Sequence, residues 1–228
     1  MATDNKLDVI VSLTTWAGRI NEPTLPKVLF RLLDQQNTKY NYKVVLVLST
    51  DEFGDNYELP PTLELLTHHD KFEIIWTKEN TKALKKLDPT MEKYPDLPII
   101  TMDDDELVTM DCIEKIMSEH KKTPNMILGG ICGTCNGVLR VGYIRLFPPH
   151  SLANRPTEYF KSYFQYTNDD EWNGIRANMK HTKSRKMDCK VILKMNYGNQ
   201  TNAFRKVYNK FNFRKALLKF KLEHKEFF

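Results

Sequence analysis

Three consecutive aspartates, Asp103, Asp104 and Asp105, follow directly on a short apolar segment of strand type at residues 99–102. Adjacent carboxylates repel one another, so placing them at the end of a buried strand costs free energy unless a cation lies among them. Carboxylate oxygens are the ligands that Mg²⁺ and Mn²⁺ prefer. Ligands of open α/β sheets bind beyond the carboxyl ends of the strands. The triplet therefore predicts a divalent-metal site at that edge of a sheet.

The same triplet has a second interpretation, a solvated acidic turn that caps a helix beginning near Leu107. If the chain stays extended through the triplet, Asp103 and Asp105 point to one side and Asp104 points to the other. The run of acids alone does not decide between a metal site and a cap.

A second acidic cluster comprises Asn168, Asp169, Asp170 and Glu171. Asn168 followed three residues later by Glu171 is the pattern of a capping box, and acids in a first turn favour the helix dipole. The alternative is a carboxylate that accepts a proton in an active site. On the residues alone the helix cap is favoured.

Size and composition indicate a globular chain. Its 228 residues are 41% hydrophobic and 11% aromatic, enough for one large domain or two small lobes. No apolar run approaches the roughly 18 residues that span a bilayer. The polar N-terminal segment lacks the features of a secretory signal. We therefore expect a cytoplasmic protein.

The net charge of +5 is concentrated at the C-terminal end. Residues 204–228 hold eight Lys or Arg against two Glu, and the other 203 residues hold 26 basic and 27 acidic side chains. A nearly neutral body argues against nucleic-acid binding, which needs a broad basic face. The tail alternates basic and apolar residues, so it is either a segment that lies on an anionic membrane surface or a terminal core helix with a solvated basic face.

The order of strand and helix patterns predicts an α/β fold. Strands are expected at 8–13, 43–49, 72–76 and 98–102. Helical segments are expected between them at 26–36, 59–66 and 81–93, the last one broken or bent at Pro89. This alternation is typical of a doubly wound sheet. After a helix at 110–121, strands at 126–132, 137–141 and 143–147 follow without helices between them, which indicates a smaller mixed region.

Short motifs spread over most of the chain, up to about residue 205, occur in a characteristic order. They are Val11–Trp16 with Arg19 and Ile20, Leu48–Ser49 with Glu52 and Phe53, Leu59–Pro60, Asn80–Thr81 with Lys85–Leu87, Ile99–Asp105, Asn136–Val138, Pro148–Pro149, Asp169–Trp172, Asn199 and Asn202. Together they resemble bacterial glycosyltransferases with the GT-A fold, family-2-like enzymes that make surface polysaccharides. The aspartate triplet resembles the D-x-D motif of that fold.

The resemblance implies a Rossmann-like, mostly parallel sheet flanked by helices, with a smaller mixed region on the acceptor side. It implies one domain over residues 1–205, with a nucleotide-sugar half at 1–106 and an acceptor half at 107–205. Residues 206–228 would form a basic amphipathic tail.

The implied reaction moves a sugar from a nucleotide-diphosphate sugar, expected to be a UDP-sugar, to a hydroxyl of a saccharide or lipid-linked acceptor. The cofactor would be Mn²⁺ or Mg²⁺, which stabilises the charge on a diphosphate leaving group. The pathway would be surface polysaccharide or lipopolysaccharide synthesis. The location would be the cytoplasm, peripheral on the inner face of the membrane through the tail.

The resemblance also assigns roles to residues of this chain. The metal would be held by Asp103, Asp105 and His181, with Asp104 as an alternative if the backbone turns early and His150 as another candidate histidine. The donor would contact Thr14, Thr15, Arg19, Asn80, Lys85, Lys86, Asp103 and Asp104. The catalytic base would be Asp169 or Asp170, and the transfer would invert the anomeric carbon.

Two alternatives remain at this point. A nucleotidyltransferase also combines an α/β sheet with metal-binding aspartates, but it needs a Gly-rich basic loop after the first strand, where this chain has only Gly18 and Arg19. The other alternative is a non-catalytic module that binds a nucleotide sugar on the same fold.

Overall fold

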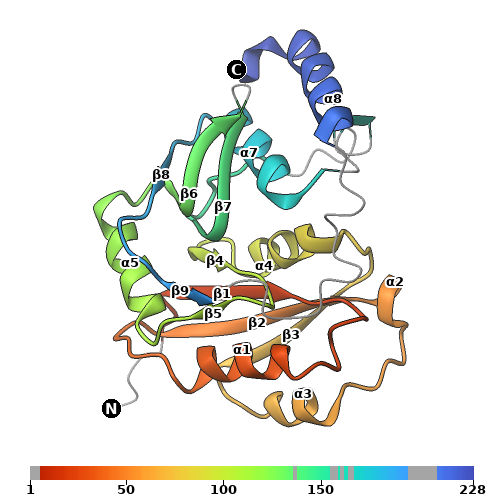
Figure 1. Ribbon diagram of the computed structural model, residues 1–228, viewed down its shortest axis with the longest axis vertical. Helices are drawn as coiled ribbons and strands as arrows, with labels where there is room; N and C mark the ends of the chain where they lie inside the picture. The colour runs from red at the N-terminus through yellow and green to blue at the C-terminus, as the bar shows by residue number, and fades with distance from the viewer. Residues whose placement is uncertain (1–5, 136–137, 155–158, 160–161, 164–166, 195–209) are drawn as a thin grey trace.

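A seven-stranded sheet forms the centre of the protein, with strand order β3-β2-β1-β4-β7-β6-β8 (Figure 1). The computed structural model describes residues 6–135, 138–154, 159, 162–163, 167–194 and 210–228. Four strands at one side are parallel to one another: β1 (Val9–Thr14), β2 (Tyr42–Ser49), β3 (Phe72–Thr77) and β4 (Ile99–Thr101). The predicted Rossmann-like, mostly parallel sheet flanked by helices is confirmed.

Strands β1 and β2 are apolar on both faces because helices cover both faces of the sheet. One face packs against α1 (Thr24–Leu33) and α3 (Pro61–Leu66), where Val11, Leu46 and Leu48 join a core cluster with those helices. The other face packs near α4 (Asp88–Lys93), where Ile10 and Val45 lie in a second cluster. Alternate residues of each strand thus enter different cores, as the period of two requires. Figure 1 shows α1 and α3 on one side of these strands and α4 on the other.

The helical segment predicted at 81–93, broken or bent at Pro89, is two elements, and the break falls at Leu87. A 3₁₀ helix, η1 (Lys82–Lys86), precedes α4, and Pro89 lies in the first turn of α4. Proline is tolerated there because its missing N–H would have no partner inside the helix. From η1, Lys85 reaches Glu52 after β2 and Lys86 reaches Asp103 after β4.

The second half is mixed, as predicted. It contains α5 (Cys112–Lys122) and an antiparallel hairpin of β6 (Ile127–Cys135) and β7 (Val138–Phe147), with β7 antiparallel to β4. β8 (Ser184–Lys186) pairs with β6, and β5 (Leu107–Val108) pairs with β9 (Ile192–Lys194) in a small separate sheet. A short helix, α2 (Thr50–Phe53), follows β2.

The expectation of two strands at 137–141 and 143–147 is wrong. The structure has one strand, β7, in which Gly142 stays in the ladder opposite Ile131. The pairing register shifts between Gly129 and Ile131, and Tyr143 has a positive φ of 62°. Gly142 therefore marks an irregularity inside the strand and not a turn between strands.

Two C-terminal helices complete the fold. α7 (Asp169–Met179) begins with the predicted cap, because the Glu171 N–H donates to Asn168 Oδ1 at 2.9 Å. α8 (Lys210–Glu223) and the 3₁₀ helix η4 (Lys225–Phe227) follow. The predicted boundary between 205 and 206 lies outside the described residues. Among the described helices, none combines the length and apolar composition needed to cross a bilayer.

Truncating the core under β2 should destabilise the whole domain. Leu46 is fully buried, so Leu46→Ala should lower the free energy of unfolding by roughly 2–5 kcal/mol through lost contacts and a cavity. Urea unfolding with an unchanged m-value would measure the loss. The control is Leu65→Ala on exposed Leu65 of α3, which should stay within about 0.5 kcal/mol. Equal effects of the two substitutions would contradict this assignment of the core.

Candidate active site

The carboxyl ends of β1 and β4 lie side by side, since these two strands are parallel neighbours. The residues that follow β1 reach the residues that follow β4. Thr15 Oγ1 donates to Asp104 Oδ2 at 2.5 Å. Arg19 forms an ion pair with Asp104 through Nη1 and with Asp105 through Nη2, the latter at 3.3 Å. Thr14 instead donates its hydroxyl to the Val47 carbonyl oxygen at 2.7 Å, which ties the end of β1 to β2.

The triplet does not stay extended. Asp104 and Asp105 are both buried and both face Arg19, whereas 49% of the Asp103 side chain is exposed and faces Lys86. The backbone turns after β4, so the condition under which Asp103 and Asp105 would point to one side is not met, and the alternative with an early turn applies. Burial raises the pKa of Asp104 to about 6, against the lowering effect of Arg19 and Thr15.

A chain of alternating charges links the triplet to the first turn of α7. Lys86, whose side chain is only 2% exposed, forms ion pairs with Asp103 and with Asp169 Oδ2, the latter at 2.9 Å. Arg145 of β7 contacts Asp169 Oδ2 at 2.7 Å through Nη2 and Asp170 Oδ1 through Nη1. We call these five residues, Asp103, Lys86, Asp169, Arg145 and Asp170, the charge network.

The two acids of α7 differ in proton affinity. Burial would raise the pKa of Asp169, but Arg145 and Lys86 outweigh burial and hold this pKa well below its usual range. Burial, together with the nearby Asp169 charge, raises the pKa of Asp170 to about 6 in spite of Arg145. The Asp170 side chain is 27% exposed and that of Asp169 is 13% exposed. Asp170 is therefore the more basic and the more accessible of the two carboxylates.

Two buried charged residues near the triplet, Arg145 and Glu106, were not predicted as site residues. Arg145 lies between the buried Ile144 and Leu146, and a buried guanidinium in an apolar strand needs a carboxylate partner. That signal was present in the sequence, although it does not name the partner. Glu106 is buried, and its Oε2 accepts the Asp103 N–H at 3.2 Å. Burial and the Asp103 charge raise the pKa of Glu106 to about 8.

Apart from Thr14, the predicted donor-binding residues divide into two groups. Lys86, Asp103, Asp104, Thr15 and Arg19 lie around the triplet, as described above. Lys85 Nζ instead contacts Glu52 Oε2 at 3.0 Å and Asn80 Oδ1 at 3.1 Å. Burial lowers the pKa of Lys85, while Glu52 opposes that effect. Asn80 and Lys85 are thus brought together, with Glu52 as an additional member.

The histidines are not brought to the aspartates. His181 is exposed and lies beyond the C-terminal end of α7, whose eleven residues extend about 16 Å from Asp169. The predicted ligation of one metal by His181 with Asp103 and Asp105 therefore does not fit this arrangement. His150 is exposed and pairs with Asp96 at 3.2 Å. Asn199 and Asn202 lie outside the described residues.

The donor chemistry at the triplet fits a hard divalent cation that arrives with phosphate. Within the described ranges no group of three or more His, Cys, Asp or Glu forms a ready metal cage. Mg²⁺ does not require one, because it is usually bound by one or two carboxylates plus substrate phosphates and water. Asp103, half-exposed, and Asp105 supply such oxygens. Arg19 and Lys86 neutralise the same carboxylates in the structure described here.

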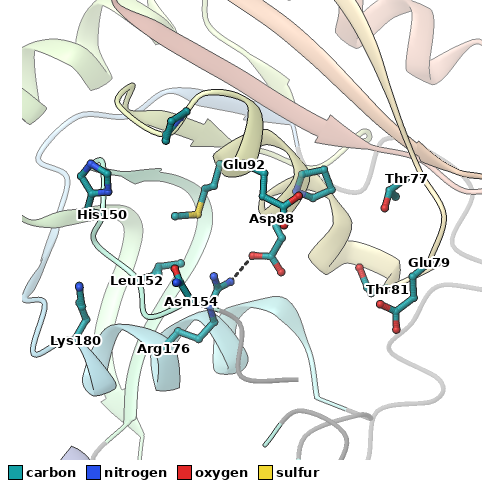
Figure 2. Close-up of a pocket in the computed structure, with 13 residues that line it drawn as sticks. Thr77, Glu79, Thr81, Asp88, Glu92, His150, Leu152, Asn154, Arg176 and Lys180 are labelled. Atoms are coloured by element: carbon teal, nitrogen blue, oxygen red, sulfur yellow. Dashed lines mark hydrogen bonds and ion pairs between the residues drawn. The ribbon is translucent and has the colours of Figure 1, made fainter. Parts of the chain in front are cut away.

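A cavity of about 690 Å³ lies between α4 and the second half of α7 (Figure 2). At its centre Arg176 of α7 pairs with Asp88, which lies two residues after Lys86. Its walls carry acids, bases, hydroxyls and apolar groups: Thr77, Glu79, Thr81, Asp88, Pro89, Met91, Glu92, Pro95, His150, Leu152, Asn154, Arg176 and Lys180. Three acids thus face two permanent cations in a polar cavity.

Comparison with known proteins gives a match in structure and none in sequence. No protein-family model matches the chain, and no curated protein matches it. Residues 1–349 of S. aureus TarS, solved in complex with UDP-GlcNAc, match with a TM-score of 0.63 at 12% identity. That match covers 95% of this chain and 66% of the TarS chain.

A second solved structure supports the same fold. The mannosyltransferase PcManGT from Pyrobaculum calidifontis, in complex with GDP-Man and Mn²⁺, matches with a TM-score of 0.52 at 14% identity. The match covers 78% of this chain and 54% of PcManGT. This chain thus has the fold of proteins solved with bound nucleotide sugars, and it spans less than two thirds of the length of these two chains.

Removing Arg145 should destabilise the fold, because two buried acids lose a cation that pairs with them. Arg145→Met leaves Asp170 without its cation and Asp169 with only Lys86, so the free energy of unfolding at pH 7 should fall by about 3–5 kcal/mol. The double variant Arg145→Met/Asp169→Asn should recover roughly 1–3 kcal/mol of that loss. Urea unfolding measures both values.

The matched control is Arg185→Met, which removes a partly exposed arginine that pairs with Glu119 and Asp188. It should cost no more than about 1 kcal/mol. A double variant less stable than Arg145→Met would contradict the assigned role of Arg145.

Proposed function

We propose that this protein is a metal-dependent glycosyltransferase that moves a sugar from a nucleotide-diphosphate sugar to an acceptor hydroxyl. The observation that carries the proposal is the charge network. In it, Lys86 and Arg145 link the triplet after β4 to Asp170, the more basic carboxylate of α7. An acidic edge suited to a metal diphosphate and a carboxylate suited to accept a proton are the two parts that such a transfer needs. The bound UDP-GlcNAc and GDP-Man of the two matched structures support the same substrate class.

The donor would bind at the carboxyl ends of β1 and β4. Thr14, Thr15 and Arg19 would border the base and ribose, with a UDP-sugar as the expected donor. Asn80, Lys85 and Lys86 would face the diphosphate, and their cations would offset its charge.

Mn²⁺ or Mg²⁺ would be held by Asp103 and Asp105, with Asp104 as the alternative because the backbone turns. When bound, the ion stabilises negative charge on the diphosphate leaving group. Lys86 and Arg19 contact the same carboxylates and would adjust to share them with the cation.

Asp170 would be the catalytic base. Asp169 is held ionised by two cations and is a weak proton acceptor, whereas a carboxylate with a pKa of about 6 is better matched to neutral pH. Asp169 would position Lys86 and Arg145. Direct attack by the acceptor hydroxyl, deprotonated by Asp170, inverts the anomeric carbon.

The acceptor would be a saccharide or a lipid-linked saccharide, and the pathway surface polysaccharide or lipopolysaccharide synthesis. The reaction would take place in the cytoplasm, at the inner face of the membrane. The order of sequence motifs supports this part of the proposal.

Binding of a nucleoside diphosphate should depend on metal. In the presence of Mn²⁺, UDP or GDP at a concentration 100 times the dissociation constant of the nucleotide should raise the free energy of unfolding by about 2.7 kcal/mol. For a chain of this size that raises the melting temperature by roughly 5–10 °C. Asp103→Asn should remove most of the metal-dependent part of the shift, and Asp96→Asn, at an exposed aspartate, should not.

The same assay separates the alternatives. Stabilisation by UTP and not by UDP would favour a nucleotidyltransferase. Metal-dependent binding of UDP-sugars without any turnover of the donor would favour a binding module. Absence of any shift with nucleoside diphosphates would refute the proposal.

Activity should fall on the acid side of pH 6. The base must be ionised, and the pKa of Asp170 is raised to about 6, so kcat/KM should rise with pH up to that value and then level off. Asp170→Asn should lower turnover by about 10²–10⁴-fold. Asp169→Asn removes a like charge beside Asp170 and so should lower the pKa of Asp170. The acid limb of the pH profile should therefore move to lower pH. The pKa of Asp104 is also raised to about 6, but a profile governed by Asp104 would not move in this variant. Full activity of Asp170→Asn would refute the assignment.

A further inference from the structure

The helix α8 has two apolar sides, and the protein body covers only one of them. Phe213, Leu217 and Phe220 are buried and lie three or four residues apart, so they form one stripe. This stripe packs in a cluster that includes Trp172 and Ile175 of α7. The predicted alternative of a terminal core helix is therefore correct for this face of the tail.

The opposite side carries a pair of exposed leucines. Leu218 and Leu222 are 61% and 64% exposed, and they lie one turn apart. Arg214, Lys215 and Lys219 are also exposed. At 3.6 residues per turn these five residues fall within a sector of about 140°, centred opposite the buried stripe. We call this sector the outer face of α8.

The outer face is basic. Residues 210–228 hold six Lys or Arg against two Glu. Both acids have partners: Glu223 accepts the Tyr163 hydroxyl, and Glu226 lies 3.5 Å from His224. Figure 1 shows α8 beyond α7, at the opposite end of the molecule from α1 and α3. A positively charged surface with leucines at its centre is thus presented away from the central sheet.

We propose that the outer face of α8 docks on an anionic lipid bilayer. Leu218 and Leu222 would enter the boundary between head groups and acyl chains, and Arg214, Lys215 and Lys219 would lie at the lipid phosphates around them. Charge complementarity selects this occupant, because a second copy of the chain would bring two basic faces together and they would repel. Only the purpose of this docking rests on the proposed function: it would hold the protein near a lipid-linked acceptor.

Docking would also orient the candidate active site. The buried stripe of α8 contacts the helix whose first turn carries Asp169 and Asp170. Leu84, in the same cluster, lies directly before Lys85. The membrane contact would therefore fix the distance of the charge network from the bilayer surface.

Vesicle co-sedimentation of the 228-residue chain tests the proposal. The protein should bind vesicles of equal parts phosphatidylglycerol and phosphatidylcholine, and bind vesicles of phosphatidylcholine alone at least tenfold more weakly. Binding should weaken as salt is added, because exposed charges are screened.

Two variants divide the surface into its charged and apolar parts. Each basic residue near an anionic surface is worth about a fivefold change in binding, so Arg214→Gln/Lys215→Gln/Lys219→Gln should weaken binding by well over tenfold. Leu218→Gln/Leu222→Gln should weaken it without any change in net charge. Circular dichroism should show that both variants keep their helix content.

The matched control is Lys27→Gln/Lys71→Gln/Lys78→Gln, which removes the same charge from exposed lysines on α1 and at the two ends of β3. It should bind anionic vesicles nearly as well as the unaltered chain. Equal loss in the control and the α8 variant would overturn the proposal, because binding would then follow net charge alone.

Two other results would overturn it. One is no binding to anionic vesicles by the unaltered chain. The other is a dimer in sedimentation velocity that Leu218→Gln/Leu222→Gln dissociates, which would make a second copy the occupant. The melting shift with UDP and Mn²⁺ separates a failure of the docking proposal from a failure of the proposed function. A normal shift without vesicle binding refutes only the docking surface. Vesicle binding without a shift refutes only the transferase.

Discussion

The arrangement of the site depends on the pairing of buried charges of opposite sign. Lys86 and Arg145 are almost fully buried, and burying either cation without carboxylates beside it would cost a large free energy. Asp169 contacts both cations and so joins η1, β7 and α7 at one point. Breaking one member leaves a charge without its partner, which is far more costly than losing an exposed ion pair. The network therefore explains why elements far apart in the sequence meet in one geometry.

The network also separates the two acids of α7 chemically. Neighbours of the same type, on the same helical turn, differ because Asp169 contacts two cations and Asp170 contacts one. One remains a fixed anion, and the other gains a pKa near neutrality. Adjacent carboxylates with such different proton affinities are a pattern of acid–base sites, where one group holds the geometry and the other exchanges the proton.

Sequence patterns predicted the sheet well and the site in part. The strands β1 and β2 follow from apolar residues on both faces, and the cap of α7 follows from Asn168 and Glu171, because both signals are local. The turn after Asp103 was only an alternative at the level of sequence, since it places two of the acids against Arg19, which reaches them from the turn after β1. The contact of Lys86 with Asp169 joins residues 83 positions apart, and no periodicity records such a distance. His181 was misplaced because the length of α7 carries it away from the triplet.

The pairing of β7 with β4 has a consequence for how this chain tolerates changes in length. Thr101 pairs with Arg145, so the guanidinium owes its position to the short run of ladder between Arg145 and Phe147. A single inserted or deleted residue within that run would turn Arg145 to the other side of the sheet and leave the acids of α7 unmatched. The register irregularity of the hairpin lies between the pairs Gly129–Arg145 and Ile131–Gly142, just outside this run. Insertions and deletions should therefore be tolerated at the end of the β6–β7 hairpin that is distant from β4, and they should disrupt the site when they fall next to β4.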